Sequence, residues 1–302
     1  MWLDPKSVLK FVIWLISLKI FTYVFDHYLF PIVRPGDKIN TMLDKLQKYY
    51  KFDYSNVELS GEFIQLNPDT ETKLFLEHCK TLQSKFFAYL GQCLVYANLR
   101  SIFTLTSLHA MMDRGHMMVL SESQFSTLFR HRKFKRVIDL GAGDGKVSEK
   151  LANALSLPFS ELKVTDTQSQ IRKRLKQRGF SIQDTDNWHV GQKFDLISMM
   201  NLLDRCEKPK TMLRQAHASL DTDGRLLVAS VVPFRQSVEW RRNRIADEYF
   251  STNRSTSWEA QCEQVAKELV EVEGFQLEYY SKVPYLSEGD VKKPFYVLPN
   301  GA

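Results

Sequence analysis

Residues 136–147 read RVIDLGAGDGKV, and this short stretch decides the fold of the chain. The apolar pair Val137-Ile138 leads into Asp139, three glycines follow at alternate positions, and a polar, helix-like segment begins after them. Glycines permit positive φ angles and a close approach of the backbone to a ligand. A buried strand, a tight glycine turn and a helix in this order are typical of a sheet edge that holds a nucleotide-sized ligand. The alternative is a glycine turn that binds no ligand.

Downstream of residue 134 the chain alternates between predicted strands and helices. We expect strands over 135–140, 161–165, 194–200 and 224–232, helices over 146–155, 169–178, 208–220 and 258–273, and two closing strands over 275–285 and 294–298. Nearly continuous apolar strands that alternate with helices indicate a parallel sheet covered on both faces. The sequence therefore predicts an α/β fold for this part of the chain.

The residues before this sheet divide into two further regions. Leu43, Leu46 and Tyr49 fall on one helical face, and Ser121 followed by Gln124 matches a capped helix start. No Pro/Gly/Ser-rich linker separates these helices from the sheet, so we expect them to pack on it. The expected organisation is a hydrophobic segment at 1–33, a helical region at 34–130 and the α/β domain at 131–302.

The hydrophobic segment is interrupted by charge at Lys10, Lys19 and Asp26. An uninterrupted membrane span needs about 20 apolar residues. We interpret the segment as a membrane-associated helix, either a signal anchor or a helix in the interface, and expect a location at the endoplasmic reticulum or another endomembrane. A signal-peptide core, a mitochondrial location and a helix docked on the protein's own core are the alternatives.

Composition and residue spacing set expectations about partners and metal sites. The chain has 302 residues and a net charge of +6, with ordinary apolar and charged fractions, so a sizeable core is available. The basic run 130–136 is interpreted as a solvated linker, and no nucleic-acid partner is expected. The four cysteines and seven histidines are dispersed without zinc-binding spacing, so free thiols and no metal are expected. We expect a monomer.

Polar residues at the predicted strand ends form a candidate site. In an open α/β sheet the ligand lies at the carboxyl ends of the strands. Asp139 precedes the glycine turn, Asp166 ends the second strand, and Asn201 and Asp204 follow the strand 194–200. A carboxylate at position 166 can accept hydrogen bonds from ribose hydroxyls. Alternatively, Asp166 caps the next helix, and Asn201 and Asp204 order the loop before 208–220.

The turn 139–145 has the pattern D-x-G-x-G-x-G, which departs from the dinucleotide fingerprint G-x-G-x-x-G. It resembles the first motif of class I S-adenosylmethionine (SAM) methyltransferases. The runs NLLDRC at 201–206 and PYLSEGD at 284–290, together with 231–234 and 295–298, further resemble the DREV family of methyltransferase-like proteins. The resemblance extends from about residue 110 to the C-terminus and is weaker over 40–110.

This resemblance implies a Rossmann-like class I SAM-dependent methyltransferase fold and a protein-histidine N-pros (Nδ1) methyltransferase. Its protein substrates would carry His-x-His motifs with a small middle residue, and S-adenosylhomocysteine would be the product. By the same resemblance the site residues are Asp139, Gly141 and Gly143 in the SAM turn, Asp166 at the ribose, Asn201 and Tyr285 in the cofactor pocket, and Asp204 and Tyr296 facing the substrate imidazole, with Asn201 also counted as catalytic.

Two positions depart from the family pattern, and neither changes the expected chemistry. The ribose-binding acid, Glu in the family, is Asp166, and a tandem Tyr-Tyr is Phe295-Tyr296 here. SAM carries an activated methyl group, so the enzyme mainly aligns the nucleophile with it. Neutral imidazole has one basic nitrogen and one N–H. A carboxylate such as Asp204 that accepts the Nε2–H would leave Nδ1 free to react and would stabilise the imidazolium.

Two other functions compete with this one. A SAM-dependent enzyme that acts on a small molecule or lipid would suit the apolar N-terminus. A non-catalytic scaffold with this fold is the second alternative, and the coincidence of Asp139, Asp166, Asn201 and Asp204 argues against it.

We expect removal of residues 1–33 to leave a soluble protein that still binds SAM, because this segment contributes nothing to the predicted site. Calorimetric titration of the full-length and shortened proteins with SAM measures the effect. Equal affinities would show that the segment contributes nothing to SAM binding, whereas loss of SAM binding would favour a helix docked on the protein's own core.

Overall fold

The computed structural model describes residues 38–53, 58–83, 91, 98–99, 108–109, 112–130, 132–238, 244–251, 257–290 and 293–297. The hydrophobic segment 1–33 lies outside these residues, so its membrane association stays a prediction. Within the described part of the chain, no helix combines the length and the apolar character that crossing a membrane requires.

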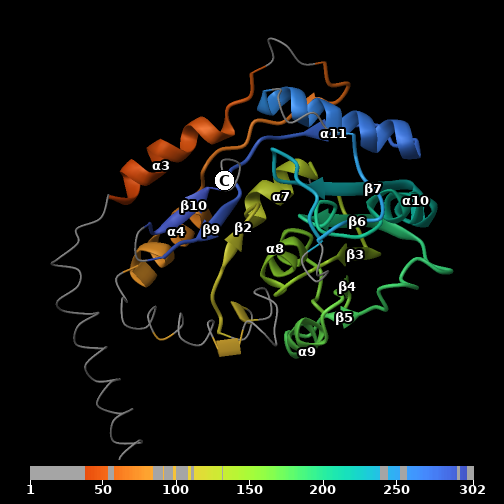
Figure 1. The fold of residues 1–302 in the computed structure, drawn as a ribbon, viewed down its shortest axis with the longest axis horizontal. Helices are drawn as coiled ribbons and strands as arrows, with labels where there is room; N and C mark the ends of the chain where they lie inside the picture. The colour runs from red at the N-terminus through yellow and green to blue at the C-terminus, as the bar shows by residue number, and fades with distance from the viewer. Residues whose placement is uncertain are drawn as a thin grey trace, which may run out of the picture.

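A five-stranded parallel sheet forms the centre of the molecule (Figure 1). Its strands in spatial order are β5 (Ser181–Ile182), β4 (Lys163–Thr165), β3 (Val137–Leu140), β6 (Phe194–Met200) and β7 (Leu220–Ala229). The chain runs outward from β3 to β5 and then returns to the other side of β3. The strand order therefore reverses between β3 and β6, and open α/β sheets bind their ligands at such a switch point.

Helices cover both faces of this sheet. They are α8 (Lys146–Ala154), α9 (Ser169–Gln177), α10 (Pro209–Ser219) and α11 (Trp258–Glu273). Val137 and Leu196 pack with α8 and α9, whereas the next residues along the same strands, Ile138 and Ile197, pack with α10 and α11. Successive side chains of a strand point to opposite faces, which explains this division. The predicted α/β fold with helices on both faces is confirmed.

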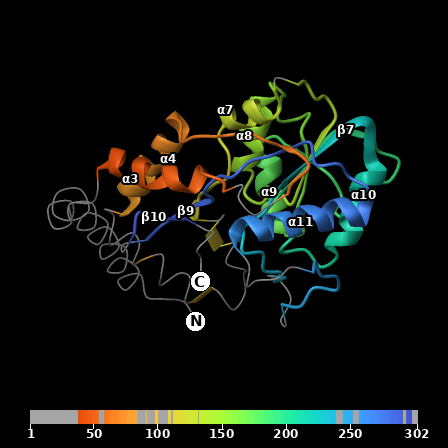
Figure 2. The same ribbon diagram turned by 90° about the horizontal axis from the view of Figure 1, so that it is seen from above.

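The N-terminal region contributes to the same core. Its described helices are α3 (Ile39–Gln47), the 3₁₀ helix η2 (Lys48–Tyr50), α4 (Thr70–Gln83) and α7 (Glu122–Leu128). Tyr50, Leu66 and Phe125 belong to one hydrophobic cluster with Val137 and Leu196 of the central sheet. In Figure 2, α7 lies beside α8, and α3 and α4 lie beside β9 and β10.

The last strands form two small sheets with the N-terminal region instead of closing the central sheet. β8 (Tyr279–Tyr280) pairs in parallel with β1 (Glu62–Phe63). β9 (Leu286–Glu288) pairs antiparallel with both β10 (Phe295–Val297) and β2 (Met117–Met118). Of the described residues in the closing strands expected over 275–285 and 294–298, only 279–280 and 295–297 are strands, and neither belongs to the central sheet. Apolar patterning shows which residues suit a strand but not which distant segment pairs with it.

The N-terminus of α7 is capped as its sequence predicts. Ser121 Oγ accepts a hydrogen bond from Gln124 N at 3.0 Å, and Gln124 Oε1 accepts one from Ser121 N at 3.0 Å. Ser121 Oγ also donates to Asp69, directly before α4. The cap therefore stabilises the start of α7 and joins it to α4.

We expect Ser121→Ala to lower the free energy of unfolding by about 1–2 kcal/mol, because the buried Gln124 N–H loses its acceptor. Equilibrium denaturation followed by circular dichroism measures the change. Thr127→Ala, at an exposed position of the same helix, is the control and should change the free energy by less than about 0.5 kcal/mol. Equal losses in the two variants would show that the cap contributes nothing.

Candidate active site

The glycine turn 141–145 leaves the carboxyl end of β3 and is held against the end of β4. Gly141 N donates to Thr165 Oγ1 at 3.2 Å. All three glycines of the turn have positive φ, between 56° and 84°, a region that residues with a Cβ rarely adopt. A Cβ at position 141 would also lie 2.7 Å from Leu202 Cδ1. The backbone conformation and the contact with the loop after β6 together require glycine at Gly141.

Asp139 is buried at the base of this turn. Its carboxylate accepts hydrogen bonds from Ser148 Oγ at 2.5 Å and Ser198 Oγ at 2.6 Å, and the residue is 2% exposed. Burial raises the pKa of Asp139 to about 6, against the lowering effect of the two hydroxyls. Because Ser148 belongs to α8 and Ser198 to β6, the carboxylate links the three elements around the turn. The glycine motif reveals Asp139 but neither serine.

Asp166 follows β4 and reaches the glycine turn. Its Oδ2 accepts a hydrogen bond from Gly143 N at 3.2 Å, and its Oδ1 accepts one from Gln168 N at 2.9 Å. The second bond orders the chain just before α9, as the alternative role of Asp166 at the start of this helix predicts. The side chain is partly exposed. A partly exposed carboxylate against the glycine turn suits an acceptor of hydrogen bonds from a bound ribose.

Three predicted site residues meet after β6. Asn201 has a φ of 55°, and its N–H donates to Ala229 O at 2.8 Å, so the chain turns sharply at the carboxyl edge of the sheet. The side chain of Asn201 is hydrogen-bonded to the Tyr285 hydroxyl. The charge of Asp204 contributes to raising the pKa of the same hydroxyl. Burial is the main cause that raises the pKa of Tyr285 to about 12. Asn201, Asp204 and Tyr285 therefore form one cluster at the switch point.

Among the described residues, Asp204 carries a buried carboxylate oxygen without a hydrogen-bond partner. Its Oδ1 is shielded from solvent and bonds none of the residues that the structure describes, whereas its Oδ2 lies 3.8 Å from Arg205 Nε. Burial raises the pKa of Asp204, and the charge of Arg205 opposes this rise. A buried polar atom that makes no hydrogen bond is costly and rare in native structures. The free Oδ1 therefore marks a position where a ligand can supply a donor.

Tyr296 stands apart from this cluster in the described contacts. It lies on β10, and its hydroxyl donates to Asp290 Oδ2 at 2.9 Å. Burial and the neighbouring Asp290 carboxylate raise the pKa of Tyr296. The structure thus groups Asp139, Gly141, Gly143 and Asp166 at the turn, and Asn201, Asp204 and Tyr285 after β6.

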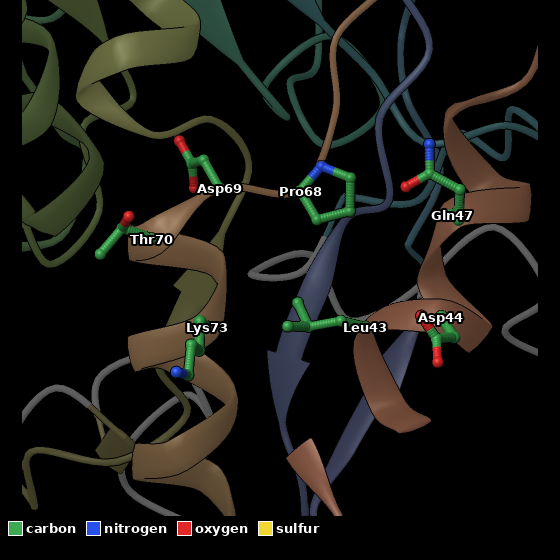
Figure 3. Close-up of a pocket in the computed structure, with 7 residues that line it drawn as sticks. All are labelled: Leu43, Asp44, Gln47, Pro68, Asp69, Thr70 and Lys73. Atoms are coloured by element: carbon green, nitrogen blue, oxygen red, sulfur yellow. The ribbon is translucent and has the colours of Figure 1, made fainter. Parts of the chain in front are cut away.

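A separate hollow lies in the N-terminal region, between α3 and the chain that enters α4 (Figure 3). Asp69 lines it, but the Asp69 carboxylate already accepts hydrogen bonds from Ser121, Ser123 and Thr72. The Asp69 carboxylate is therefore committed to the start of α4 and α7, and the predicted site residues lie at the carboxyl edge of the central sheet instead.

Residues 49–301 match the model of the DREV methyltransferase family, and the chain belongs to this family. Family membership and the parallel sheet confirm the predicted fold of a class I SAM-dependent methyltransferase. The predicted resemblance and the predicted SAM cofactor are confirmed with it. The family match does not specify the group that receives the methyl.

Solved methyltransferase structures resemble the chain at low identity. DesVI of Streptomyces venezuelae is 15% identical, with 44% of this chain and 56% of that chain covered and a TM-score of 0.30. A possible histamine N-methyltransferase of Thermotoga maritima is 19% identical, with 45% and 58% covered and a TM-score of 0.28. The plantazolicin methyltransferase BpumL, solved with S-adenosylhomocysteine, is 17% identical, with 53% and 61% covered and a TM-score of 0.32. This chain thus spans less than two thirds of each of these structures.

We expect Asp139→Asn to change how stability depends on pH. The pKa of Asp139 is about 6 in the folded protein. In the unfolded chain an aspartate has a pKa near 4. This contribution to stability is therefore complete below pH 4 and is lost as the pH rises through 6. Between pH 4 and 7 the wild-type free energy of unfolding should fall by about 3 kcal/mol relative to the variant.

Denaturation at a series of pH values measures this difference. Asp223→Asn, at an exposed position near the start of β7, is the control and should leave the pH profile of the wild type unchanged. Parallel profiles for the wild type and Asp139→Asn would contradict the assignment.

Proposed function

We propose that this member of the DREV family transfers the methyl group of SAM to Nδ1 of histidine in protein His-x-His motifs with a small middle residue. One observation carries the proposal: Asp204 Oδ1 is buried and has no hydrogen-bond partner among the described residues, and it lies beside Asn201 and Tyr285. An imidazole Nε2–H is a donor of the kind that this oxygen lacks. The resemblance of the NLLDRC and PYLSEGD runs to the family supports the same assignment.

The residues at the switch point fit SAM. The glycine turn lets a ligand approach the backbone closely, and Asp166 would accept hydrogen bonds from the ribose hydroxyls. Asn201 and Tyr285 would line the pocket on the side of β6. Bound SAM supplies an activated methyl group, so these residues need only hold and orient it.

Asp204 would select the reactive nitrogen of the substrate. When its carboxylate accepts the Nε2–H, the lone pair of the imidazole lies on Nδ1. As Nδ1 gains the methyl group, the ring becomes a cation, and the adjacent carboxylate stabilises it strongly because the site is shielded from water. The proton on Nε2 leaves afterwards, and the neutral methylated ring is released. No nucleophilic side chain of the enzyme is needed.

The raised pKa of Asp204 gives this mechanism a pH dependence. Only the ionised carboxylate stabilises the imidazolium, so turnover should increase as the pH rises through the pKa of Asp204. The charge of Arg205 favours the ionised carboxylate and therefore limits the rise in the pKa of Asp204.

We also propose the cellular setting. The interrupted apolar segment 1–33 supports attachment to the endoplasmic reticulum or another endomembrane, where a monomer would meet its protein substrates without a nucleic-acid partner. Fractionation of cells that express the full chain and the chain without 1–33 tests the attachment.

The direct test of the function is incubation of the enzyme with labelled SAM and a His-x-His peptide, followed by fragmentation that locates the methyl. We expect it on Nδ1 of a motif histidine. Peptides with a bulky middle residue or with one histidine replaced by alanine are the controls. Labelling of a lipid or small-molecule extract but of no peptide would support the competing SAM-dependent function.

We expect Asp204→Asn to retain SAM affinity and to lose turnover by on the order of 10²-fold or more, because the neutral amide cannot stabilise the imidazolium and presents N–H groups to Nε2–H. Kinetics on a His-x-His peptide, with SAM titration in parallel, separate the two effects. Near-normal turnover, or a methyl on Nε2, would overturn the role assigned to Asp204.

Two variants serve as comparisons for this experiment. Asp223→Asn makes the same chemical change at an exposed position of β7 and should leave turnover unchanged. Tyr296→Phe should cost far less turnover than Asp204→Asn, because the Tyr296 hydroxyl is bound to Asp290.

A further inference from the structure

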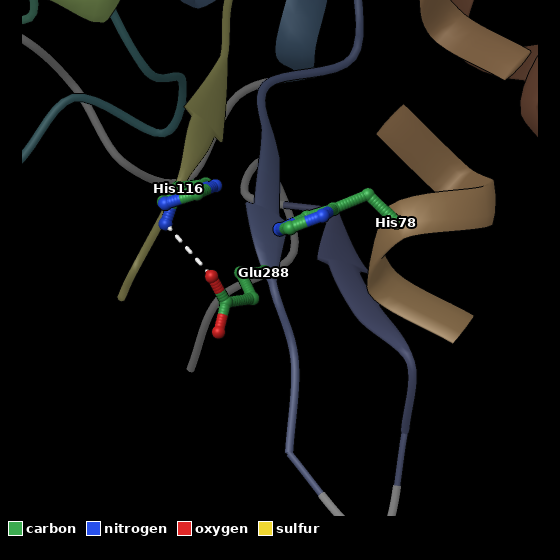
Figure 4. Close-up of side chains that lie close together, drawn as sticks. All are labelled: His78, His116 and Glu288. Carbon is green, nitrogen blue, oxygen red and sulfur yellow. Dashed lines mark hydrogen bonds between the residues drawn. The ribbon is translucent and has the colours of Figure 1, made fainter. Parts of the chain in front are cut away.

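Two histidines and a glutamate gather where α4, β2 and β9 meet (Figure 4). His78 belongs to α4, His116 directly precedes β2, and Glu288 ends β9. Their potential ligand atoms all lie within 4.8 Å of one another. The two imidazole rings are parallel, with centroids 4.9 Å apart and an interplanar angle of 3°. This cluster lies outside the site proposed for methyl transfer and has no role in it.

We propose that His78, His116 and Glu288 bind a divalent transition-metal ion of the zinc class. Two imidazole nitrogens and one carboxylate oxygen form a donor set that Zn²⁺ accepts, and a water molecule can supply the fourth ligand. Ligand atoms at zinc bond lengths lie about 3.4 Å apart in a tetrahedral site, so the longest separation in the cluster must shorten by up to about 1.4 Å. His78 is exposed, so its side chain is free to rotate inward.

Glu288 is already oriented for this role. Its side chain is almost fully buried, Arg114 Nε binds Oε1, and His116 N donates to Oε2 at 3.2 Å. A carboxylate held in this way loses little freedom when it binds a metal, and groups behind a ligand commonly fix its direction. Oε2 retains a lone pair that can bind the ion.

Lys146 and Asp113 adjoin the ring nitrogen of His116 that faces the cluster. The Lys146 ammonium contacts Nε2 of His116, and Asp113 Oδ1 lies 3.5 Å from the same nitrogen. Lys146 Nζ also lies 3.0 Å from Asp113 Oδ1 and can keep this partner when it leaves His116. Lys146 thus occupies part of the site as a cation that a metal ion can displace.

A bound ion would connect three segments that are far apart in the sequence. It would fix α4 against β2 and β9. Met117 lies in β2 and Tyr285 directly precedes β9, and the Tyr285 hydroxyl is 2.7 Å from Met117 Sδ. The ion would therefore stabilise the packing of the N-terminal region on the segment that carries Tyr285. The metal proposal does not depend on which group receives the methyl, because none of the three proposed ligands belongs to the methyl-transfer site.

Titration of the full-length, chelator-treated protein with Co²⁺ and then Zn²⁺ tests the proposal. We expect one equivalent of Co²⁺ to give d–d absorption bands that Zn²⁺ abolishes, and Zn²⁺ to raise Tm. His78→Ala and Glu288→Gln should each weaken binding by about tenfold or more. His217→Ala, an exposed histidine on α10, is the matched control and should leave the affinity unchanged.

Lys146→Ala separates a metal site from a simple histidine stack. Removal of the competing ammonium should tighten Co²⁺ binding severalfold, whereas a stacked pair with no metal would give no binding in any variant. Absence of the absorption bands, or equal affinity in the wild type, His78→Ala and Glu288→Gln, would overturn the proposal. Weaker binding by Lys146→Ala would also overturn it. SAM titration of each variant shows whether the methyltransferase fold is retained.

Discussion

The candidate site depends on the carboxylate of Asp139, which is buried between the hydroxyls of Ser148 and Ser198. A buried carboxylate is costly unless it is hydrogen-bonded, so both serines must stay in place for the folded state to be stable. Ser148 fixes α8, and Ser198 fixes β6. The glycine turn lies between these elements. The Asp139 carboxylate therefore fixes the turn relative to the loop after β6.

Thr165 holds the other side of the same turn. Its Oγ1 accepts the N–H of Gly141 at 3.2 Å, and its carbonyl accepts the N–H of Ala142 at 3.0 Å. Together with Asp139, these bonds fix the turn to β4, α8 and β6 before any ligand arrives. A crevice that is ordered in this way loses little conformational freedom on binding, which favours precise placement of the methyl donor.

The parts of the fold that could be predicted from the sequence are those determined by local patterns. The strand at Phe194–Met200 and the helix at Trp258–Glu273 have the bounds that their apolar patterns predict, and Ser121 caps α7 as expected. The pairing of β8 with β1 could not be predicted, because nothing in either two-residue strand specifies its partner. Sequence patterns define elements, whereas packing between distant segments defines the minor sheets.

The residues of the candidate site likewise include some that the sequence identifies and some that only the structure shows. The D-x-G-x-G-x-G pattern identifies Asp139 and the glycines because the backbone conformation requires those residue types at fixed spacing. Ser148 and Ser198 lie in ordinary helix and strand positions, so only the folded chain shows that they bind Asp139. The Oδ1 of Asp204, which lacks a partner among the described residues, is likewise a property of packing, since a sequence shows a carboxylate but not whether its oxygens are paired.

The N-terminal region completes this site as well as covering the sheet. Met117 Sδ contacts the Tyr285 hydroxyl at 2.7 Å, and β2, which contains Met117, pairs with β9 directly after Tyr285. Tyr285 in turn bonds Asn201 at the edge of β6. The small sheet β10-β9-β2 therefore reaches the cluster at the end of β6 through Met117 and Tyr285, and under the proposed function it would lie next to the substrate. A change of substrate in related chains would then require changes in this small sheet and its helices, with the glycine turn and its supports left intact.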